Sequence, residues 1–399
     1  MKEVLFVINT LGRAGAETAF LELLKGLDTQ KIHVSLYVLM NQGEMVQELP
    51  EGVKLLNKQY KALSVLSREG KKILSRQVWR AMFTRMTVIR LFPYLLKHFM
   101  SMLLKHRVLP DKLLWRVMSD GGQVINNQYD LAVAFLEGGS AYYVADHVKA
   151  VKKAAFIHVD YQKAGYTRKL DNSCYLKYDK IFTVSGEVRD AFLEVYPECK
   201  ERAEIFHNMI DRDKICSMAA LPGGFVDDFE GWRILTVGRL TEQKALEFSI
   251  DAMKRLKDEG LQVKWYVLGE GERRSFLEER VRKLGLEEDF MLFGAVENPY
   301  PYMLQADLYV HASRFEGKSL AIQEAQILGK AVLVSDCNGN REQVEQNVDG
   351  MMCALTPEGI AEGIKMLLED EEKRERLGKA AALKETAGRK ELDKIYSLL

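Results

Sequence analysis

The stretch Ser313-Arg314-Phe315-Glu316-Gly317-Lys318-Ser319-Leu320-Ala321-Ile322-Gln323-Glu324-Ala325 follows the apolar run 308–310 and predicts a strand, a loop and a helix in succession. Ser319 is a typical helix-capping residue, and Gly329 indicates the end of a helix that reaches Leu328. The backbone N–H groups at the start of such a helix attract phosphate through their free donors and the helix dipole. The stretch therefore predicts a parallel α/β unit with an anion site at the helix N-terminus.

Glu324 is expected on the apolar side of this helix. On helical spacing it follows Leu320 by one turn and precedes Leu328 by one turn, so it shares their stripe. A carboxylate in such a position needs a partner. The partner is either an Arg or Lys of the protein core or the two hydroxyls of a nucleotide ribose, and we favour the ribose.

Arg239 and Lys244 lie in a second segment of the same kind. The apolar run 233–237 leads into Gly238, Arg239 and, after a short polar loop, Lys244. An Arg offers a planar fork and a Lys a mobile point charge, a pairing that suits a diphosphate whose charge grows as it leaves. Either cation alone is more typical of a solvated surface, but both at the carboxyl end of a strand favour an anion site.

Composition and charge narrow the class of protein. The 399 residues suffice for two domains, and 57 basic residues balance 57 acidic ones, which gives no electrostatic reason to expect nucleic acid. Five widely spaced cysteines without a CxxC pair argue against a disulfide framework and a zinc site, so we expect a cytoplasmic location. The apolar run 4–8 is too short for a signal peptide, and no window is apolar enough for a transmembrane helix.

Strand-like and helical segments alternate along nearly the whole chain, a pattern typical of parallel sheets covered by helices. We expect residues 1–209 and 210–384 to form two facing Rossmann-like doubly wound domains that enclose a cleft, with a C-terminal helix at 385–399 completing the first. The glycine-containing stretch 221–228 is the expected connection between them. The candidate strands are residues 4–8, 34–39, 131–136, 154–158, 181–184 and 204–207, then 233–237, 263–268, 290–293, 308–311 and 331–335.

The segment at about residues 66–118 interrupts this alternation and is expected to be a helical insertion in the first domain. Between Arg68 and Arg116 it holds twelve Lys or Arg residues against Glu69 and Asp111, interleaved with large apolar side chains. Such a composition fits an anionic membrane surface. A helical insertion that exposes its basic face to solvent fits equally well, and both interpretations stay open.

Together these motifs resemble the retaining glycosyltransferase family 4, whose members have the GT-B fold. In the second half, the resemblance rests on Gly238-Arg239 followed by Lys244, on Glu316 and Glu324 with seven residues between them, and on Asn298-Pro299-Tyr300 before Ala306-Asp307. In the first half, Gly12-Arg13-Ala14-Gly15-Ala16-Glu17 resembles the Gly-Gly-Ala-Glu loop of that family. Phe156-Ile157-His158-Val159-Asp160, after Phe135-Leu136-Glu137-Gly138, resembles the form found in bacterial capsule, lipopolysaccharide and exopolysaccharide enzymes.

The resemblance implies a function. The protein would move a sugar from a nucleotide sugar, with UDP favoured, to a saccharide or lipid-linked saccharide acceptor in the synthesis of surface polysaccharides. The first domain would bind the acceptor and the second the donor. The basic segment 68–116 would allow a peripheral position on the inner face of the cell membrane.

The resemblance also implies a role for each matching residue. Donor binding would fall to Gly12, Gly15, Gly238, Arg239, Lys244, Gly269, Val296, Glu316, Gly317, Lys318, Ser319, Leu320 and Glu324. Within this set Glu324 would hold the ribose, Glu316 and the amides after it the transferred sugar, and Arg239 with Lys244 the diphosphate. The catalytic residues would be His158, Glu316, Arg239 and Lys244, and Glu17, Glu137 and Asp160 would lie on the acceptor side.

In this family the donor configuration is retained and no metal cofactor is needed, because the cations and the helix terminus supply the positive charge. Asp211-Arg212-Asp213 has the spelling of a metal-binding motif but does not follow a donor loop, so we expect no metal there. Three departures from the family pattern are visible. Lys318 and Ser319 stand where many relatives carry a more apolar or glycine-rich loop, although the Glu-Gly-Lys form also occurs in the family. Ala245 stands where a glycine usually follows the lysine, and Arg13-Ala14 replaces a tight glycine pair.

Other classes of protein share parts of this pattern. A dehydrogenase would need a full GxGxxG motif, and residues 269–274 lack its third glycine. A nucleotide-sugar epimerase of similar fold is the main alternative, since it would bind the same donor and transfer nothing. A non-catalytic membrane-bound partner would use the basic segment alone, and the presence of the whole donor motif set argues against it.

Overall fold

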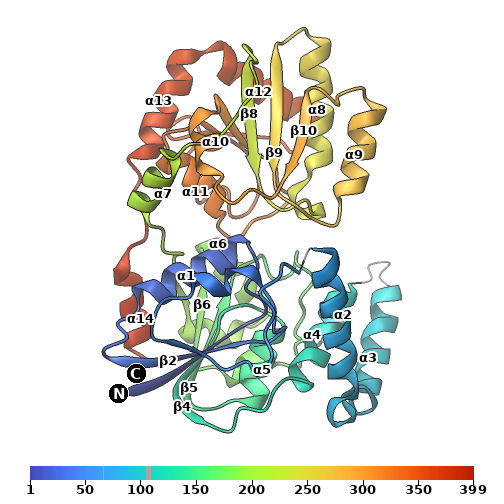
Figure 1. Cartoon of the computed structure of the whole chain (residues 1–399), viewed down its shortest axis with the longest axis vertical. Helices are drawn as coiled ribbons and strands as arrows, with labels where there is room; N and C mark the ends of the chain where they lie inside the picture. Colours follow the sequence, from blue (N-terminus) through green and yellow to red (C-terminus); the bar gives the residue numbers. More distant parts are fainter. Residues whose placement is uncertain (66, 105–108) are drawn as a thin grey trace. The chain divides into compact units, whose positions relative to one another are not determined.

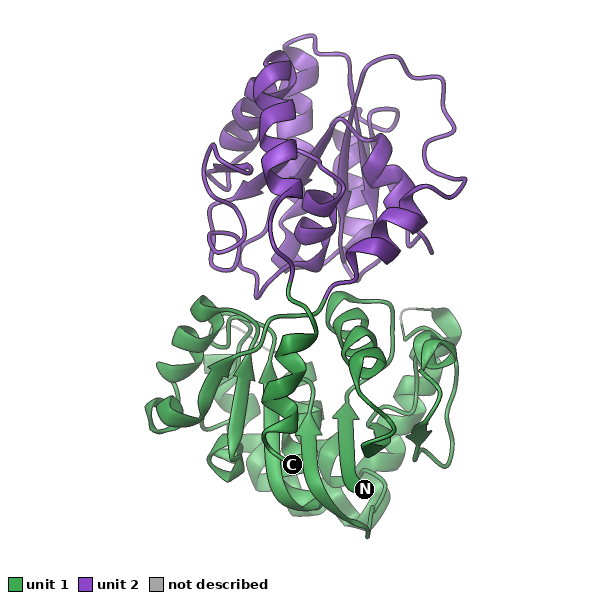
Figure 2. Cartoon of the chain, turned by 90° about the vertical axis from the view of Figure 1, so that its left-hand side faces the viewer, with its two compact units in different colours: residues 1–209, 387–399 green, residues 210–386 purple. Residues whose placement is uncertain are grey.

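The computed structural model describes residues 1–65, 67–104 and 109–399, which form two compact units (Figure 2). The first unit comprises Met1–Met209 and Ala387–Leu399, and the second comprises Ile210–Thr386. Each unit holds one parallel sheet covered by helices (Figure 1). The predicted fold class, two parallel-sheet α/β domains, is thereby confirmed.

The sheet of the first unit has seven parallel strands in the order β3-β2-β1-β4-β5-β6-β7. The strands are β1 (Lys2–Ile8), β2 (Ile32–Val38), β3 (Val53–Leu55), β4 (Gln128–Ala134), β5 (Lys149–Ile157), β6 (Lys180–Thr183) and β7 (Ala203–Ile205). Their apolar runs are buried on both faces, as parallel strands under helices require. The order reverses between β1 and β4, and the loops after these strands are therefore a favoured place for a ligand.

Helices cover both faces of this sheet. Phe20 of α1 packs against Phe6 on one face, and α4, α5 and α6 contribute to the core cluster on the other. The helices are α1 (Gly15–Gly26), α2 (Arg68–Phe83), α3 (Thr87–Leu104), α4 (Pro110–Asp120), α5 (Gly139–His147), α6 (Gly186–Leu193) and α14 (Asp393–Tyr396). Short 3-10 turns are η1 (Glu44–Glu48), η2 (Thr84–Met86), η3 (Cys174–Lys177), η4 (Pro197–Arg202) and η6 (Arg389–Leu392).

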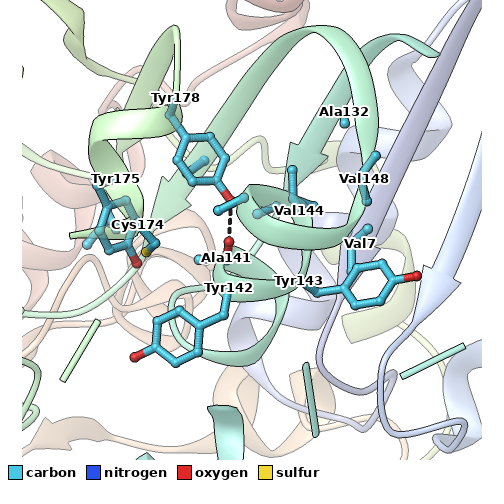
Figure 3. Packing of buried hydrophobic residues seen from close by; sticks show 14 of the residues in the cluster. Val7, Ala132, Ala141, Tyr142, Tyr143, Val144, Val148, Cys174, Tyr175 and Tyr178 are labelled. Carbon is cyan, nitrogen blue, oxygen red and sulfur yellow. Dashed lines mark hydrogen bonds between the residues drawn. The ribbon is translucent and has the colours of Figure 1, made fainter. Parts of the chain in front are cut away.

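The core around α5 is rich in tyrosine (Figure 3). The Tyr178 hydroxyl donates to the carbonyl of Ala141, and the Tyr142 and Tyr161 hydroxyls both donate to the buried carboxyl of Asp171. Burial raises the pKa of Asp171 to about 6, although these hydroxyls lower it. The hydroxyls of Tyr142, Tyr161 and Tyr178 thus have partners inside the unit, which indicates a structural role for these three residues.

The second unit has six parallel strands in the order β10-β9-β8-β11-β12-β13. These are β8 (Trp232–Val237), β9 (Val263–Leu268), β10 (Phe290–Gly294), β11 (Leu308–His311), β12 (Val332–Ser335) and β13 (Met351–Cys353). Side chains alternate between a core shared with α8 (Leu246–Asp258), α9 (Arg274–Lys283) and α12 (Pro357–Glu369) and a core shared with α10 (Tyr300–Gln305) and α11 (Leu320–Ile327). The remaining helices are α7 (Arg212–Ala219), α13 (Glu371–Ala382) and the 3-10 turn η5 (Glu242–Lys244).

The structure differs from two expectations, the position of the connection between the units and the form of the C-terminal helix. Residues 221–228 do not join the units, because they lie inside the second one. There the ring of Phe225 packs at a tilt against Tyr266, and the Phe225 N–H donates to Gln305. The expected helix 385–399 is two short pieces, η6 and α14, and Lys394 of α14 ties them to β7 by donating to the carbonyl of Ile205. Glycine content alone does not distinguish a linker from a folded loop. A helical pattern of apolar residues also does not show whether the helix is continuous or broken into two pieces.

The insertion forms α2, η2, α3 and α4, which lie together in the first unit (Figure 1). The segment exposes fewer of its basic side chains than the sequence predicts. Arg116 is buried and pairs with Asp146, and Lys112 lies over the ring of Tyr166, so neither belongs to an exposed basic face. Lys105 and Arg107 of the predicted basic set lie outside the described residues.

The apolar residues of α2 and α3 divide between two faces. Leu74, Val78, Met82, Leu91 and Leu95 pack against the core of the first unit. A second set is exposed and consists of Trp79, Phe83, Met86, Ile89, Phe92, Leu96, Phe99, Met100, Leu103 and Leu104. We call this second set the exposed apolar stripe. Of the helices that the structure describes, none is long and apolar enough to cross a bilayer.

Candidate functional site

Lys244 and Glu316 meet at the carboxyl ends of two neighbouring strands. Lys244 ends η5, which follows β8, and Glu316 lies in the loop between β11 and α11. Lys244 Nζ donates to Glu316 Oε1 at 2.6 Å, and His311 Nε2 lies 3.0 Å from Lys244 Nζ and 3.1 Å from Glu316 Oε1. The three groups form a closed, largely buried triangle.

The charges of this triangle depend on one another. Burial alone would raise the pKa of Glu316, but the charge of the Lys244 ammonium lowers it well below its usual range. Burial and the Lys244 charge lower the pKa of His311, so the imidazole is neutral. The site therefore holds one carboxylate and one ammonium beside a neutral ring.

Three glycines allow the loops around these groups to pack closely against one another. A Cβ on Gly238 would lie 3.4 Å from Lys244 Cε, so the lysine stem passes directly over this residue. Gly269 has a φ of +151°, and a Cβ there would lie 1.9 Å from the carbonyl oxygen of Gly238. Gly339 has a φ of +83° and packs against the backbone of Glu316 and Gly317 at a spacing that a side chain would block. Close backbone contact therefore fixes the loops after β8 and β9 and the loop that carries Glu316.

The helix N-terminus predicted at Ser319 is present. Helix α11 begins at Leu320, Gly329 follows its end with a φ of +70°, and the Ser319 hydroxyl makes no capping hydrogen bond. Ser319 therefore begins the helix without the side-chain cap that the sequence predicts. Gly317, Lys318, Ser319 and Leu320 together form the turn between Glu316 and the first turn of α11.

Glu324 lies on α11, half-buried, and accepts a hydrogen bond from the Tyr300 hydroxyl at 3.1 Å. Burial raises its pKa to about 7, while Tyr300 and the charge of Lys214 lower it. Among the described residues Glu324 has no ion pair, so the alternative of a salt bridge to a core Arg or Lys is wrong. A carboxyl that titrates near neutrality and keeps acceptor capacity is suited to a diol.

Arg239 and Val296 lie in the loops that follow β8 and β10. Arg239 follows Gly238, is exposed, and forms no ion pair with any residue in the described parts of the chain. Val296 lies in the loop after β10 and packs partly against the core of the second unit. Ala245, at the position where the family has glycine, adopts a left-handed conformation with φ of 47° and begins α8.

In the first unit, His158 and Glu137 lie together. His158 follows β5, and its backbone N–H donates to Glu137 Oε2 at 3.0 Å. Burial lowers the pKa of His158 to about 4, while a hydrogen bond to the backbone of Phe135 raises it. His158 Nε2 is buried and has no hydrogen-bond partner. This side chain is therefore a neutral imidazole with one unused nitrogen.

The other predicted residues of the first unit follow β1 or β5 in the sequence. Thr10 donates to Glu17 Oε1 at 2.9 Å, and Gly15 is the first residue of α1. Gly12 has open space around it, since a Cβ there would lie 4.0 Å from its nearest neighbour. Asp160 is buried and pairs with Lys163 at 3.2 Å. Asp160 and Glu17 thus have partners within the protein.

The structure also brings in one residue that sequence reasoning missed. His311 was expected only as the end of a strand, and nothing in its local sequence marks it as part of the site. The available signal was its position, a polar residue at the carboxyl end of a buried strand five residues before Glu316. Asp211 of the Asp-Arg-Asp sequence caps α7 by accepting from the N–H of Lys214, which explains that motif structurally.

Comparison with known proteins identifies the family of the segment that holds this site. Residues 228–384 match the family model of glycosyl transferases group 1, so this segment is a glycosyltransferase group 1 domain. The chain is 31% identical over 223 residues to an N-acetylgalactosamine-N,N'-diacetylbacillosaminyl-diphospho-undecaprenol 4-alpha-N-acetylgalactosaminyltransferase of Campylobacter jejuni, covering 55% of this chain and 58% of that protein. It is 33% identical over 144 residues to an amylovoran biosynthesis glycosyltransferase of Erwinia amylovora, covering 34% of this chain and 35% of the relative. The match thus spans less than two thirds of either relative.

Solved structures extend the likeness to the whole chain. The Anabaena protein HepE in complex with UDP-glucose aligns with a TM-score of 0.69 over 100% of both chains at 15% identity. A mutant of S. aureus TarM, in complex with UDP and other ligands, aligns with a TM-score of 0.65 over 100% of this chain and 99% of that chain at 13% identity. These likenesses show the GT-B fold. They give no support to the nucleotide-sugar epimerase.

Proposed function

We propose that the protein is a glycosyltransferase that moves a sugar from a nucleoside diphosphate sugar, with UDP favoured, to a saccharide or lipid-linked saccharide. The observation that carries the proposal is the buried Lys244–Glu316 pair beside the start of α11, in the unit that holds the group 1 domain. A cation and a helix N-terminus together suit a diphosphate. The named relatives act on diphospho-undecaprenol glycans or in amylovoran biosynthesis, and HepE is bound to UDP-glucose.

Each group has a chemical task in this proposal. Lys244 and Arg239 would bind the diphosphate, and Glu324 would accept hydrogen bonds from the ribose. Glu316 would contact the transferred sugar, and the unused Nε2 of His158 would accept a hydrogen bond from one of its hydroxyls. The two cations and the start of α11 would stabilise the negative charge that develops on the diphosphate as it departs, so no metal would be required.

The proposed reaction retains the configuration of the donor. The bond between the anomeric carbon and the phosphate oxygen breaks while the acceptor oxygen forms its bond on the same face. The acceptor proton passes to the departing phosphate oxygen. A covalent glycosyl-enzyme would require a carboxylate under the anomeric carbon, and this proposal assigns no residue to that task.

The exposed apolar stripe supports a lipid-linked acceptor on an anionic membrane. On α3, Ile89, Phe92, Leu96, Phe99 and Leu103 follow one another at intervals of three and four residues and so share one face. On α2, Lys72, Arg76, Trp79 and Phe83 follow the same spacing, which places cations and aromatic rings on one exposed face. Apolar side chains flanked by cations favour the surface of an anionic bilayer.

Nucleotide binding tests the donor site first. Purified protein is screened by thermal shift with UDP, GDP, ADP and CMP in the presence of EDTA. A ligand at a hundredfold excess over Kd stabilises the folded protein by about 2.7 kcal/mol. We expect one nucleotide family to raise the melting temperature of the wild type and of Glu375→Ala, an exposed control on α13, and to have little effect on Glu324→Ala. No shift with any nucleotide would reject the donor site.

Product analysis then tests the transfer itself. The nucleotide sugar that corresponds to the bound nucleotide is incubated with undecaprenyl diphosphate glycans, and NMR of the product reports the anomeric configuration. Retention with EDTA present is expected. Release of the nucleotide only when the acceptor is present separates transfer from donor hydrolysis, and an inverted product would contradict the proposed reaction.

Vesicle sedimentation tests the membrane surface. Wild-type protein should sediment with vesicles that contain phosphatidylglycerol and remain in solution with phosphatidylcholine alone. The double variant Phe92→Glu/Phe99→Glu should lose this binding, while Val151→Glu, an exposed apolar position on β5 outside the stripe, should keep it. Equal binding of both variants, or none by the wild type, would reject the membrane surface.

A further inference from the structure

His311 lies at the centre of the donor group without an assigned role. Its side chain is 1% exposed, and its Nε2 lies 3.0 Å from Lys244 Nζ and 3.1 Å from Glu316 Oε1. Its other nitrogen, Nδ1, lies 3.3 Å from the hydroxyl of Tyr309, which donates to the carbonyl of Val237. Each ring nitrogen therefore has a polar neighbour, and these neighbours determine where the ring proton lies.

The neighbours favour one tautomer. With the proton on Nδ1, Lys244 donates to Nε2, Nδ1–H donates to the Tyr309 oxygen, and the Tyr309 O–H donates to Val237. Each donor in this chain then meets an acceptor. With the proton on Nε2, the N–H group could donate to Glu316 Oε1 at 3.1 Å, but it would also face the Lys244 ammonium at 3.0 Å. Tyr309 would then have to donate either to Nδ1 or to the carbonyl of Val237. The first arrangement leaves the Nε2 lone pair 3.1 Å from Glu316 Oε1, but the Lys244 ammonium donates to both of these acceptors and offsets their repulsion. It forms more hydrogen bonds than the second arrangement and avoids two opposed donors.

This tautomer constrains Lys244. An ammonium group has three N–H donors. One donates to Glu316 Oε1, and a second donates to the Nε2 lone pair of His311. The third remains for an incoming anion, and the Lys244 side chain is 14% exposed, so solvent and ligand can reach it.

We propose that His311 is a positioning residue, which holds Lys244 as a hydrogen-bond acceptor in the Nδ1–H tautomer set by Tyr309 and so orients the lysine toward the donor diphosphate. This inference rests on the proposed function for the identity of the anion. Without the His311 acceptor, Lys244 would keep its ion pair with Glu316 but could rotate about it. Loss of a charge-assisted hydrogen bond to a ligand weakens binding by about tenfold or more.

Three variants separate this role from general stability. His311→Leu replaces the ring with an apolar side chain of similar size and removes both nitrogens. His311→Gln offers an amide oxygen that can still accept from Lys244, and Tyr309→Phe removes the partner that sets the tautomer. We expect His311→Leu to weaken UDP binding by about tenfold and to leave uridine binding unchanged, because uridine carries no phosphate. His311→Gln should bind UDP within about threefold of the wild type.

The tautomer is measured directly by long-range ¹H–¹⁵N correlation NMR on protein labelled at its seven histidines. His311 is assigned by the signal that disappears in His311→Gln. We expect the pattern of an Nδ1–H imidazole in the ligand-free wild type, and a mixture of tautomers in Tyr309→Phe. A merely structural role for the ring would not require this tautomer or its dependence on Tyr309.

The outcomes distinguish the two proposals. If the wild type binds UDP and His311→Leu binds it equally well, or if uridine and UDP weaken together, the positioning role is wrong and the function stands. An Nε2–H tautomer in the wild type also overturns the role. If no nucleotide binds the wild type, the proposed function fails, and His311 is then judged by its tautomer alone.

Discussion

Lys244 Nζ lies 2.6 Å from Glu316 Oε1, and both side chains are largely buried, with 14% and 7% of their surface exposed. The pair joins the loop after β8 to the loop after β11, and these two strands are neighbours in the sheet. A parallel sheet thus brings together two charges that lie far apart in the sequence. Because the surroundings exclude most water, each charge depends on the other for its stability.

Removal of the Lys244 cation should destabilise the second unit. Lys244→Met leaves a buried carboxylate without its cation, and we expect a loss of about 3 kcal/mol in the free energy of unfolding at pH 7. Urea unfolding is followed by tryptophan fluorescence in a Trp79→Phe/Trp115→Phe background, so that only Trp232 and Trp265 of the second unit contribute to the signal. The double variant Lys244→Met/Glu316→Gln should recover part of the loss, and Lys254→Met, which breaks an exposed pair with Asp258, should change little.

The same experiment has a definite pH dependence. The folded pKa of Glu316 lies below its ordinary value, so the stability that its charge contributes is present above the unfolded pKa, near 4.3, and is lost as the pH falls through the folded pKa. In Lys244→Met, burial is no longer opposed by the cation and raises the pKa of Glu316 above its ordinary value, so the difference between wild type and variant should already shrink as the pH falls from 7 to 4 and the variant's carboxyl takes up a proton. A difference that stays constant from pH 7 to pH 4 would contradict the buried ion pair.

The raised pKa of Glu324 predicts a pH dependence of folding stability with the opposite sign. Its folded pKa is raised to about 7, so its charge costs stability in the ligand-free protein, and that cost grows as the pH rises from the unfolded pKa, near 4.3, to about 7. Ribose hydroxyls donate to the carboxylate and therefore bind the charged form better. With a bound pKa well below 7, a nucleotide sugar should bind about tenfold more tightly at pH 8 than at pH 6.

A nucleotide sugar is the appropriate ligand for this measurement, because its diphosphate is a diester that does not titrate between these pH values. Isothermal titration at pH 6, 7 and 8 gives the affinities. Glu324→Gln cannot ionise and should bind with an affinity that is independent of pH. Equal pH dependence in the variant and the wild type would assign the proton to another group.

The left-handed backbone conformation of Ala245 should determine how substitutions at this position change the free energy of unfolding. Ala245 occupies a left-handed conformation with φ of 47° and is fully buried. Ala245→Gly relieves the backbone but loses a buried methyl group, so we expect a change in unfolding free energy of less than about 1 kcal/mol. Ala245→Val places a branched side chain in the same conformation and should cost more than about 2 kcal/mol, measured by the same urea unfolding. Equal stability of the two variants would argue against the left-handed conformation.

The parts of the structure that sequence predicted share a local cause. Long buried strands such as β1 and β9 are continuous apolar runs, and α11 is marked by Ser319 at its start and Gly329 at its end. Glu316 and Glu324 could be found because both lie on one strand-loop-helix unit. The three-residue strands β3 and β13 were missed, whereas β7, which is equally short, overlaps the predicted strand 204–207.

The parts that sequence did not predict depend on contacts between distant segments. His311 joins the site because β11 lies beside β8, and no local pattern gives that order. Tyr300 as the partner of Glu324 depends on how α10 packs beside α11. In α3, Leu95 faces the core and Leu96 is exposed, and their order in the sequence does not reveal which face the domain covers.

Gly269 gives the most direct test of the loops around the donor site. Its N–H donates to the carbonyl of Gly294 at 2.8 Å, and the N–H of Gly238 donates to Leu268 at 3.0 Å, so the loops after β8, β9 and β10 are linked through their backbones. In Gly269→Ala, the new Cβ would lie 1.9 Å from the Gly238 carbonyl oxygen, and one of the two loops must move. Displacement of Gly238 also displaces the stem of Lys244 above it.

Gly260→Ala is the matched control for this substitution. Gly260 also has a positive φ, +84°, but a Cβ there would meet no atom within 4 Å, so only the backbone strain of about 1 kcal/mol applies. We expect Gly269→Ala to cost at least about 3 kcal/mol in unfolding free energy and to abolish UDP binding, because strain and steric overlap act together. Gly260→Ala should keep its UDP affinity. Equal losses in the two variants would show that backbone strain alone matters, and that close contact between the loops does not hold Lys244 in place.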